Sequence, residues 1–107
     1  MQNLRALLSP LRAFDAVYRA KGVSRAAQLL HVTPGAVSQQ IKQLETGLGV
    51  QLFQKAGREI ELTAVGERFA TRVCDAFDRL HEALGDLADS QRAVSYTHLR
   101  AHETRED

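Results

Sequence analysis

The sequence lacks the marks of a secreted, disulfide-bonded or membrane protein. Its single cysteine, Cys74, cannot form an internal disulfide, which fits a reducing compartment. It contains no apolar run of about 18 residues, and its N-terminus does not have the layout of a signal peptide. We therefore expect a soluble, cytoplasmic protein without a membrane-spanning segment.

Aromatic residues are also scarce. They make up 6% of the 107 residues, whereas 44% of the chain is hydrophobic. That apolar content is too high for a disordered chain. It predicts one small domain, with or without an appendage, whose core is mainly Leu, Val, Ile and Ala.

Charge is nearly balanced overall but not along the chain. The net charge is +1. Residues 1–63 carry eight basic and four acidic side chains, whereas residues 64–94 carry four basic and six acidic ones. The basic first part favours a polyanion partner, and ordinary solvation of the surface is the alternative.

Capping signals predict two helices near the N-terminus. Ser9 and Pro10 mark the start of the first, because Ser caps free amides and Pro suits the first helical position. Gly22 marks its end, and Ser24 caps the second helix. Apolar residues recur at helical spacing after each start, so each helix has one face for a core.

A third helix follows after a short turn. Thr33 caps it, Pro34 takes its first position and Gly47 ends it. Its inward positions are apolar, whereas its outer face carries Ser, Gln and Lys, which suit hydrogen bonds to base edges and contacts to phosphate. Gly35 allows the start of the helix to approach a DNA backbone closely. The predicted DNA contacts here are Thr33, Pro34, Gly35, Ser38, Gln39 and Lys42.

Residues 52–62 predict a two-stranded hairpin. A glycine-containing turn at Ala56 and Gly57 separates two short segments, and apolar and acidic residues alternate in the second. Lys55 and Arg58 lie beside this turn. We add both to the predicted DNA contacts.

Thr63 can cap a long helix over residues 64–92. This stretch has no proline, and its apolar residues recur at alternating steps of three and four, the pattern of paired helices. The seam consists of Ala70, Val73, Phe77, Leu80, Leu84 and Leu87, of which the last five are the predicted dimerisation residues. Nothing else in the chain is large enough to cover the seam, so we predict a homodimer through the long helix.

The last segment differs from the rest. The stretch "SYTHLRAHETRED", from Ser95, has neither a heptad nor a cap and resembles a read-through of adapter or vector sequence. We expect residues 93–107 to be a non-native or disordered tail outside the fold.

Together these elements predict a mainly α fold, in which a winged helix-turn-helix of three helices and a hairpin wing is followed by a dimerisation helix. The predicted domains are residues 1–63, 64–92 and 93–107. In this architecture the third helix, about residues 34–46, lies in the major groove of double-stranded DNA. The alternative is a protein–protein interaction module in which the long helix acts without DNA specificity.

The order of the motifs extends this prediction. Residues 24–66, from "SRAAQLLHVTPGAVSQQIKQLE" through "LGVQLF" to "LTAVG", resemble the N-terminal signature of LysR-type transcriptional regulators. The resemblance is strongest to the glycine-cleavage activators and β-lactamase regulators. It implies a bacterial regulator that binds a partially palindromic operator as a dimer or tetramer.

The resemblance also implies roles for individual residues. It assigns base contacts to Ser38 and Gln39, and groove or phosphate contacts to Thr33 and Lys42. It places the wing, residues 55–58, at the minor groove, where Arg58 enters.

Two departures from the family pattern matter. Many members have glutamine where Pro34 stands, so the base contact of that glutamine is unavailable here. The sensor domain that binds a small-molecule effector is also missing, so we expect a regulator truncated before that domain, with the effector relevant only to a full-length protein.

No enzyme, metal or cofactor signature stands out. His81 and Glu82 lack the second histidine that a zinc-protease helix requires, because Gly85 occupies its place. His98 and His102 have metal-ligand spacing, but they lie in the tail and supply too few ligands. We therefore predict a non-enzymatic protein without a cofactor.

Overall fold

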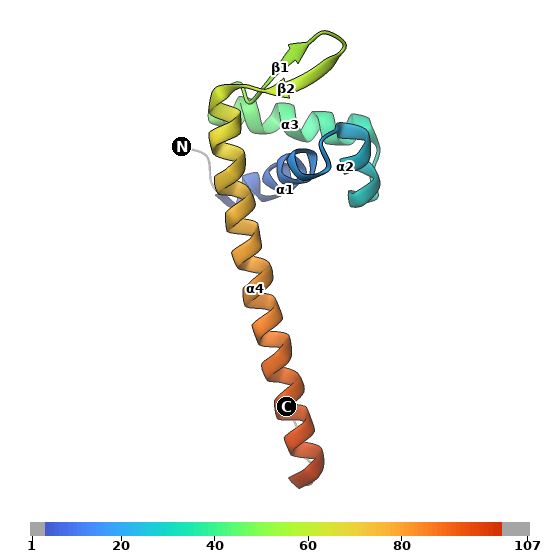
Figure 1. Cartoon of the computed structure of the whole chain (residues 1–107), viewed down its shortest axis with the longest axis vertical. Helices are drawn as coiled ribbons and strands as arrows, with labels where there is room; N and C mark the ends of the chain where they lie inside the picture. Colours follow the sequence, from blue (N-terminus) through green and yellow to red (C-terminus); the bar gives the residue numbers. More distant parts are fainter. Residues whose placement is uncertain (1–3, 102–107) are drawn as a thin grey trace. The chain divides into compact units, whose positions relative to one another are not determined.

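The structure is a computed structural model that describes the backbone of residues 4–101 and the side chains of residues 4–91. Its elements are α1 (Leu4–Ala20), α2 (Val23–Leu30), α3 (Pro34–Leu48), β1 (Phe53–Ala56), β2 (Glu59–Leu62) and α4 (Ala64–Ala101). Figure 1 shows three shorter helices beside the hairpin, which confirms the predicted winged helix-turn-helix followed by a long helix. The chain divides into two compact units, Met1–Cys74 and Asp75–Asp107.

The core of the first unit is organised around one aromatic side chain. Phe14 of α1 is fully buried, and its ring centroid lies 5.6 Å from that of Phe53 and 5.5 Å from that of Phe69. Ala26 and Ala27 of α2 are also buried, and their small size lets α2 approach its neighbours closely. The predicted aliphatic core therefore surrounds an aromatic cluster that connects α1, the hairpin and α4.

The predicted start of the first helix at Ser9 and Pro10 is wrong, because α1 begins at Leu4. Pro10 lies inside the helix, where it cannot donate a backbone hydrogen bond. Leu7 and Pro10 are both buried and extend the apolar face of α1 toward the N-terminus. Their packing offsets the missing hydrogen bond, so tertiary contacts override the local start signal.

Three other helix ends differ from the prediction by one or two residues. Lys21, and not Gly22, has the left-handed backbone conformation after α1, with φ 61°. Ser24 lies inside α2, which has no side-chain cap. Gly49, with φ 68°, ends α3, so Gly47 lies inside that helix. Each predicted boundary residue lies within two residues of the observed end, because several neighbouring residues can begin or end a helix.

Hydrogen bonds join the hairpin to the helices on either side of it. Oε2 of Glu45 on α3 accepts bonds from the backbone N–H groups of Leu52 (2.7 Å) and Phe53 (3.0 Å). The N–H of Thr63 donates to the carbonyl oxygen of Leu52 (2.9 Å). The Thr63 hydroxyl accepts from the N–H of Gly66 (2.9 Å), which confirms Thr63 as the cap of α4. The base of the hairpin is therefore fixed to both α3 and α4.

Only the first part of α4 belongs to the first unit. Ala70 and Val73 are buried. From Asp75 to residue 91 every described side chain is exposed except that of Phe77, which is half-buried. The first unit thus extends to Cys74, beyond the boundary predicted at residue 63.

The helix α4 is also longer than predicted. It continues to Ala101 instead of ending near residue 92, since neither glycine nor proline follows Gly85. The predicted tail therefore begins as helix, and residues 102–107 lie outside the described part of the chain. Within the described part, no helix is both long and apolar enough to cross a membrane.

Candidate nucleic-acid interface

The turn between α2 and α3 is closed by hydrogen bonds. His31 has a left-handed backbone conformation (φ 60°), and the N–H of Val32 donates to the carbonyl oxygen of Ala27 (3.0 Å). The Thr33 hydroxyl accepts from the N–H of Ala36 (3.1 Å), which confirms Thr33 as the cap of α3. These bonds fix the position at which α3 begins.

The helix α3 has an apolar inner face and a polar outer face. Val37, Ile41 and Leu44 are buried, with exposed fractions of 1%, 7% and 0%. The residues predicted to contact DNA from α3 and its cap are all exposed: Thr33, Pro34, Gly35, Ser38, Gln39 and Lys42. The helix therefore presents hydroxyl, amide and ammonium groups to the solvent.

The outer face of α3 carries no carboxylate. Glu45 is the one acidic residue of α3, all of which the structure describes, and it is half-buried. Its carboxylate is turned to the backbone of the hairpin, where it accepts two hydrogen bonds. Lys42 is consequently the one charged residue on the exposed surface of α3. A surface of one positive charge and several uncharged hydrogen-bonding groups suits a polyanion with polar edges, such as a DNA groove.

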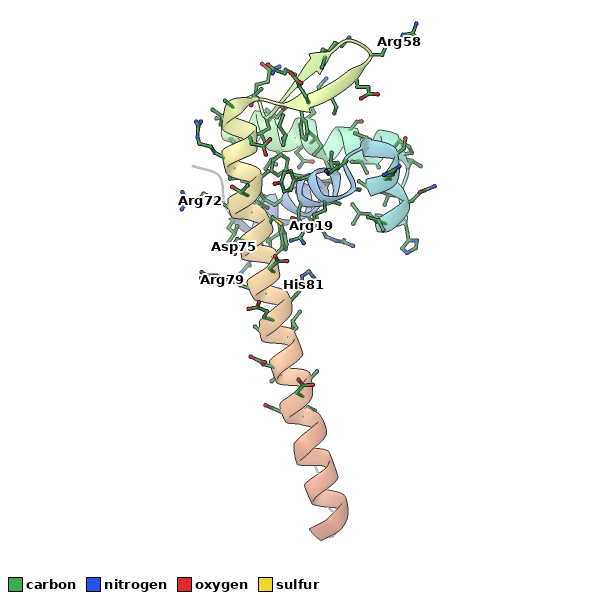
Figure 2. The ribbon with its side chains drawn as sticks, in the orientation of Figure 1. Arg19, Arg58, Arg72, Asp75, Arg79 and His81 are labelled. Atoms are coloured by element: carbon green, nitrogen blue, oxygen red, sulfur yellow. The ribbon has the colours of Figure 1, made fainter. Side chains whose placement is uncertain are left out.

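The hairpin presents positive charge at its tip. The strands pair antiparallel, with Ala56 opposite Glu59. Gly57 begins the two-residue turn with φ 68°, a conformation that glycine adopts readily. Figure 2 shows Arg58 at the tip, pointing away from the helices, and Lys55 on β1 is also exposed. The two predicted wing contacts are therefore accessible to a ligand.

Packing does not explain the glycine at the start of α3. A Cβ added to Gly35 would meet only the hydroxyl oxygen of Thr33, at 4.0 Å. The fold would tolerate a side chain at this exposed position. The open space that glycine leaves is what close approach of a DNA backbone requires.

Two residues that the sequence analysis did not predict, Gln43 and Thr46, extend the polar face of α3. Gln43 and Thr46 are exposed and line, together with Gln39 and Lys42, an open groove of about 500 Å³ between α3 and the start of α1. Their spacing in the sequence could have predicted them, because each lies four residues after a predicted contact and therefore on the same helix face. Gln40, in contrast, buries its Oε1 without a hydrogen-bond partner among the described residues.

The predicted dimerisation residues fall into two groups. Val73 is 8% exposed and packs within the first unit, so it offers little surface to a second copy. Phe77 is half-buried. Leu80, Leu84 and Leu87 are 55%, 63% and 64% exposed. The uncovered part of the seam therefore consists of these three leucines, with Phe77 at its edge.

Metal-binding geometry is absent from the part of the chain that the structure describes. No group of three His, Cys, Asp or Glu residues there could hold a metal ion. The side chains of His98 and His102 lie outside the described ones.

Comparison with known proteins gives matches over this same region. The family model described as "Bacterial regulatory helix-turn-helix protein, lysR family" matches residues 8–67, which include every predicted DNA contact. The HTH-type transcriptional regulator TrpI of Pseudomonas aeruginosa is 49% identical over 80 residues, or 75% of this chain and 27% of that protein. The glycine cleavage system transcriptional activator of Escherichia coli is 43% identical over 80 residues, or 75% of this chain and 26% of that protein.

A solved structure with bound DNA is also similar. The crystal structure of the BenM_DBD/catB site 1 DNA complex has a TM-score of 0.68 and 27% sequence identity. The similarity covers 85% of this chain and 95% of that one. By contrast, the chain spans about a quarter of the length of the two curated relatives (27% and 26%).

Proposed function

Because this chain belongs to the lysR family of bacterial regulatory helix-turn-helix proteins, we propose that it is the sequence-specific DNA-binding part of a transcriptional regulator. In this proposal the outer face of α3 enters the major groove, and the tip of the hairpin meets the minor groove. The chain pairs through α4 and binds a partially palindromic operator. A small-molecule effector acts through a further domain in the full-length regulator.

One observation supports DNA over other partners most strongly. The carboxylate of Glu45 is bonded to the hairpin backbone, so the exposed face of α3 presents Lys42 and uncharged donors and acceptors without any negative charge. Carboxylates on this face would repel phosphates. Hydroxyl and amide groups, such as those of Ser38 and Gln39, match the donor and acceptor pattern of base edges.

A second copy of the chain is the partner that best suits the uncovered face of α4. Leu80, Leu84 and Leu87 are exposed along one face, and most of the positions that flank them are alanines (residues 76, 83 and 88), with His81 as the exception. The charged side chains between residues 75 and 91 occupy other positions. An apolar seam with small flanking residues lets two helices pair closely. Pairing would place two winged helices on two half-sites, whose base-contact energies then roughly add.

The first test concerns salt dependence. Replacing Lys42 with alanine removes one phosphate contact, so the slope of log affinity against log salt should become shallower by about one unit on every DNA sequence. Fluorescence anisotropy with duplex DNA at several salt concentrations measures this slope. Arg72→Ala, which removes an exposed positive charge from α4, is the matched control and should leave the slope unchanged. If the slope of Lys42→Ala equals that of the wild-type chain, Lys42 does not contact a phosphate.

The second test concerns specificity. Gln39→Ala should cost about 1–3 kcal/mol of binding free energy on the best site and far less on random DNA, because the lost hydrogen bonds are to base edges. Titrations on the selected site and on a scrambled duplex give the two values. Gln28→Ala, at an exposed position of α2, should change neither. Equal losses on both duplexes would make Gln39 a backbone contact and not a base contact.

A further inference from the structure

A groove with one polar wall lies beside the second half of α3. It has a volume of about 500 Å³ and lies between α3 and the start of α1, two helices of the first unit that Figure 1 shows side by side. None of the described residues that line it is acidic. The side chains of Gln43 and Thr46 are exposed and form no hydrogen bond with another described residue. Both are therefore accessible to a ligand.

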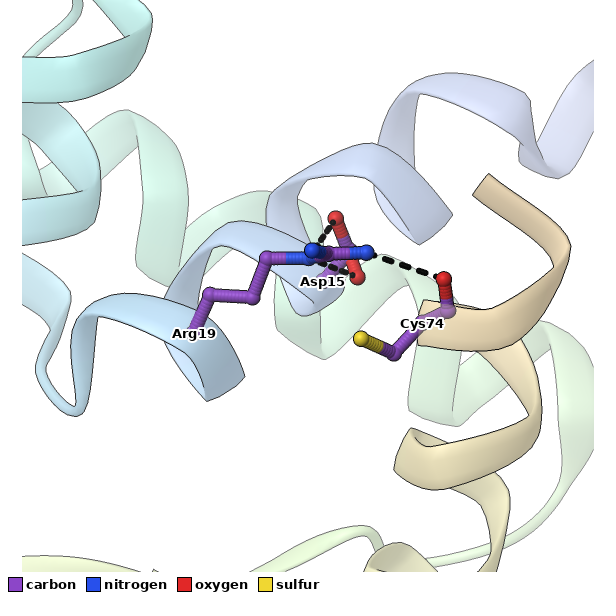
Figure 3. Close-up of polar contacts among 3 residues, drawn as sticks. All are labelled: Asp15, Arg19 and Cys74. Carbon is purple, nitrogen blue, oxygen red and sulfur yellow. Dashed lines mark hydrogen bonds and ion pairs between the residues drawn. The ribbon is translucent and has the colours of Figure 1, made fainter. Parts of the chain in front are cut away.

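The two helices that form the groove contain one carboxylate each, and both carboxylates are bonded elsewhere in the first unit. Asp15 of α1 is 13% exposed, and both of its oxygens accept from Nε of Arg19 at 3.0 Å each. Nη2 of the same Arg19 donates to the carbonyl oxygen of Cys74 at 2.9 Å (Figure 3). Glu45 of α3 accepts from the hairpin backbone. Neither helix therefore presents a free carboxylate that would repel a phosphate.

The polar face of α3 is longer than the DNA major groove is wide. Gly35, Gln39, Lys42 and Thr46 follow one another at steps of four, three and four residues, so they lie along one line of the helix. At a rise of about 1.5 Å per residue, Gly35 and Thr46 are about 16 Å apart along the axis. The major groove is about 12 Å wide. A helix that crosses it can therefore reach the phosphate backbone on both sides.

We propose that Gln43 and Thr46 bind phosphates of the second DNA strand, opposite the strand that the start of α3 approaches. The inference rests on the proposed function, because it requires α3 to lie in the major groove. Gly35 is then close to the first strand, and Ser38 and Gln39 meet base edges between the strands. The amide of Gln43 and the hydroxyl of Thr46 donate hydrogen bonds to phosphate oxygens of the second strand.

The uncharged character of these two side chains decides what their contacts do. Threonine is a poorer helix former than lysine or glutamate, so helix stability does not explain an exposed Thr46. A hydroxyl or amide that donates to a phosphate positions the protein without reading the base sequence. Because neither group is charged, its contact releases no counterion. Loss of either contact therefore weakens binding to every sequence alike and leaves the salt dependence unchanged.

The experiment measures the affinity of Thr46→Val, Gln43→Glu and Thr46→Glu for the duplex that the wild-type chain selects from random DNA and for a scrambled duplex. Thr46→Val removes the hydroxyl at nearly constant volume and should weaken binding to both duplexes about fivefold to tenfold. The two glutamate variants place a carboxylate against a phosphate and should each weaken binding about tenfold or more. Thr71→Glu adds the same charge at an exposed position of α4 in the first unit and should match wild type within about twofold.

Neutral methylphosphonates identify the strand. Neutralising the contacted phosphates of one strand should remove most of the loss caused by Thr46→Glu, because the added carboxylate then meets no charge. Gly35→Glu is the counterpart at the start of α3, where the structure leaves space for a side chain. Its loss should be relieved by neutralising the other strand. Relief of both variants by the same strand would contradict a helix that spans the groove.

Three further outcomes would overturn the proposal. If Thr46→Val and Gln43→Glu bind both duplexes as wild type does, the end of α3 does not contact DNA. If their losses are confined to the selected duplex, these residues read bases and not phosphates. If every variant with a loss also has a lower thermal unfolding midpoint, Gln43 and Thr46 support the fold. A wild-type chain that binds no duplex contradicts the proposed function itself, whereas a chain that binds while its variants match it contradicts only this inference.

Discussion

Replacing Gly66 with alanine should lower the free energy of unfolding by about 3 kcal/mol, at the upper end of the usual range for overpacking. A Cβ at this position would collide with the carbonyl oxygen of Leu52 and lie 3.0 Å from its carbonyl carbon and 3.1 Å from Cδ2 of Leu62. The Leu52 carbonyl cannot move freely, because it accepts a hydrogen bond from the N–H of Thr63. Thermal unfolding should show a midpoint lower by about 15 °C for a domain of this size.

The chain contains a matched control for this substitution. Gly85 also lies within α4, and a Cβ there would have no atom within 4 Å. Gly85→Ala should therefore stabilise the helix by about 0.5–1 kcal/mol, since alanine is the better helix former. If Gly66→Ala were as stable as wild type, α4 would not pack against the hairpin base as closely as the structure has it.

Leu80→Asp should abolish pairing of the chain and, with it, tight binding to a palindromic operator. Leu80 is 55% exposed in the single chain, so the change should not unfold the first unit. In the pair, each aspartate would place an unpaired charge in an apolar seam, which raises the dimer dissociation constant by about 100-fold or more. Sedimentation over a wide range of concentrations measures this constant, and Phe77→Asp should act in the same direction.

Arg79→Asp is the control, because it places the same residue one position earlier and away from the seam. It replaces an exposed ion pair with Asp75 by an exposed like-charge pair, and because each is worth only a few tenths of a kcal/mol, about 0.5 at most, the dimer should be nearly unchanged. Gly85 weakens α4, so we expect the wild-type chain to dimerise in a concentration-dependent way. A strictly monomeric chain that still bound a palindrome tightly would contradict this account of α4.

Local signals in the sequence were sufficient for the order of the elements. Thr33 and Thr63 are helix caps as predicted, because a cap depends on a hydrogen bond to a residue three positions later. The inner face of α3 also followed from helical spacing. These features involve neighbours in the chain, so the sequence displays them directly.

Features that depend on distant contacts could not be predicted in the same way. Pro10 lies inside α1 because burial offsets its missing hydrogen bond, and burial was not visible in the sequence. Val73 fits the heptad pattern, but in the fold it is covered by its own chain. Both features escape the sequence because periodicity shows that a face is apolar without showing what covers it.

The exposure of the predicted contact residues followed from the sequence, but the electrostatics of the surface they form did not. Helical spacing placed Ser38 and Gln39 on the outer face, where the structure has them exposed. Nothing in the sequence indicated that Glu45 would turn to the hairpin backbone and leave that face without a negative charge. That contact joins residues seven and eight positions apart through a loop, beyond the reach of pattern rules.

The most direct test of DNA binding by α3 and the hairpin is a titration of the isotope-labelled chain with its selected duplex, followed by amide chemical shifts. We expect the largest changes in amide chemical shift on residues 33–42 and 55–58, with smaller ones elsewhere in the first unit. With a scrambled duplex, the amide shifts of the wing and of Lys42 should still change, because phosphate contacts do not depend on sequence. The shift of Gln39 should change little, because base contacts require the correct sequence. Changes confined to α4, or no changes at stoichiometric DNA, would contradict the assignment of α3 and the hairpin as the DNA-binding surface.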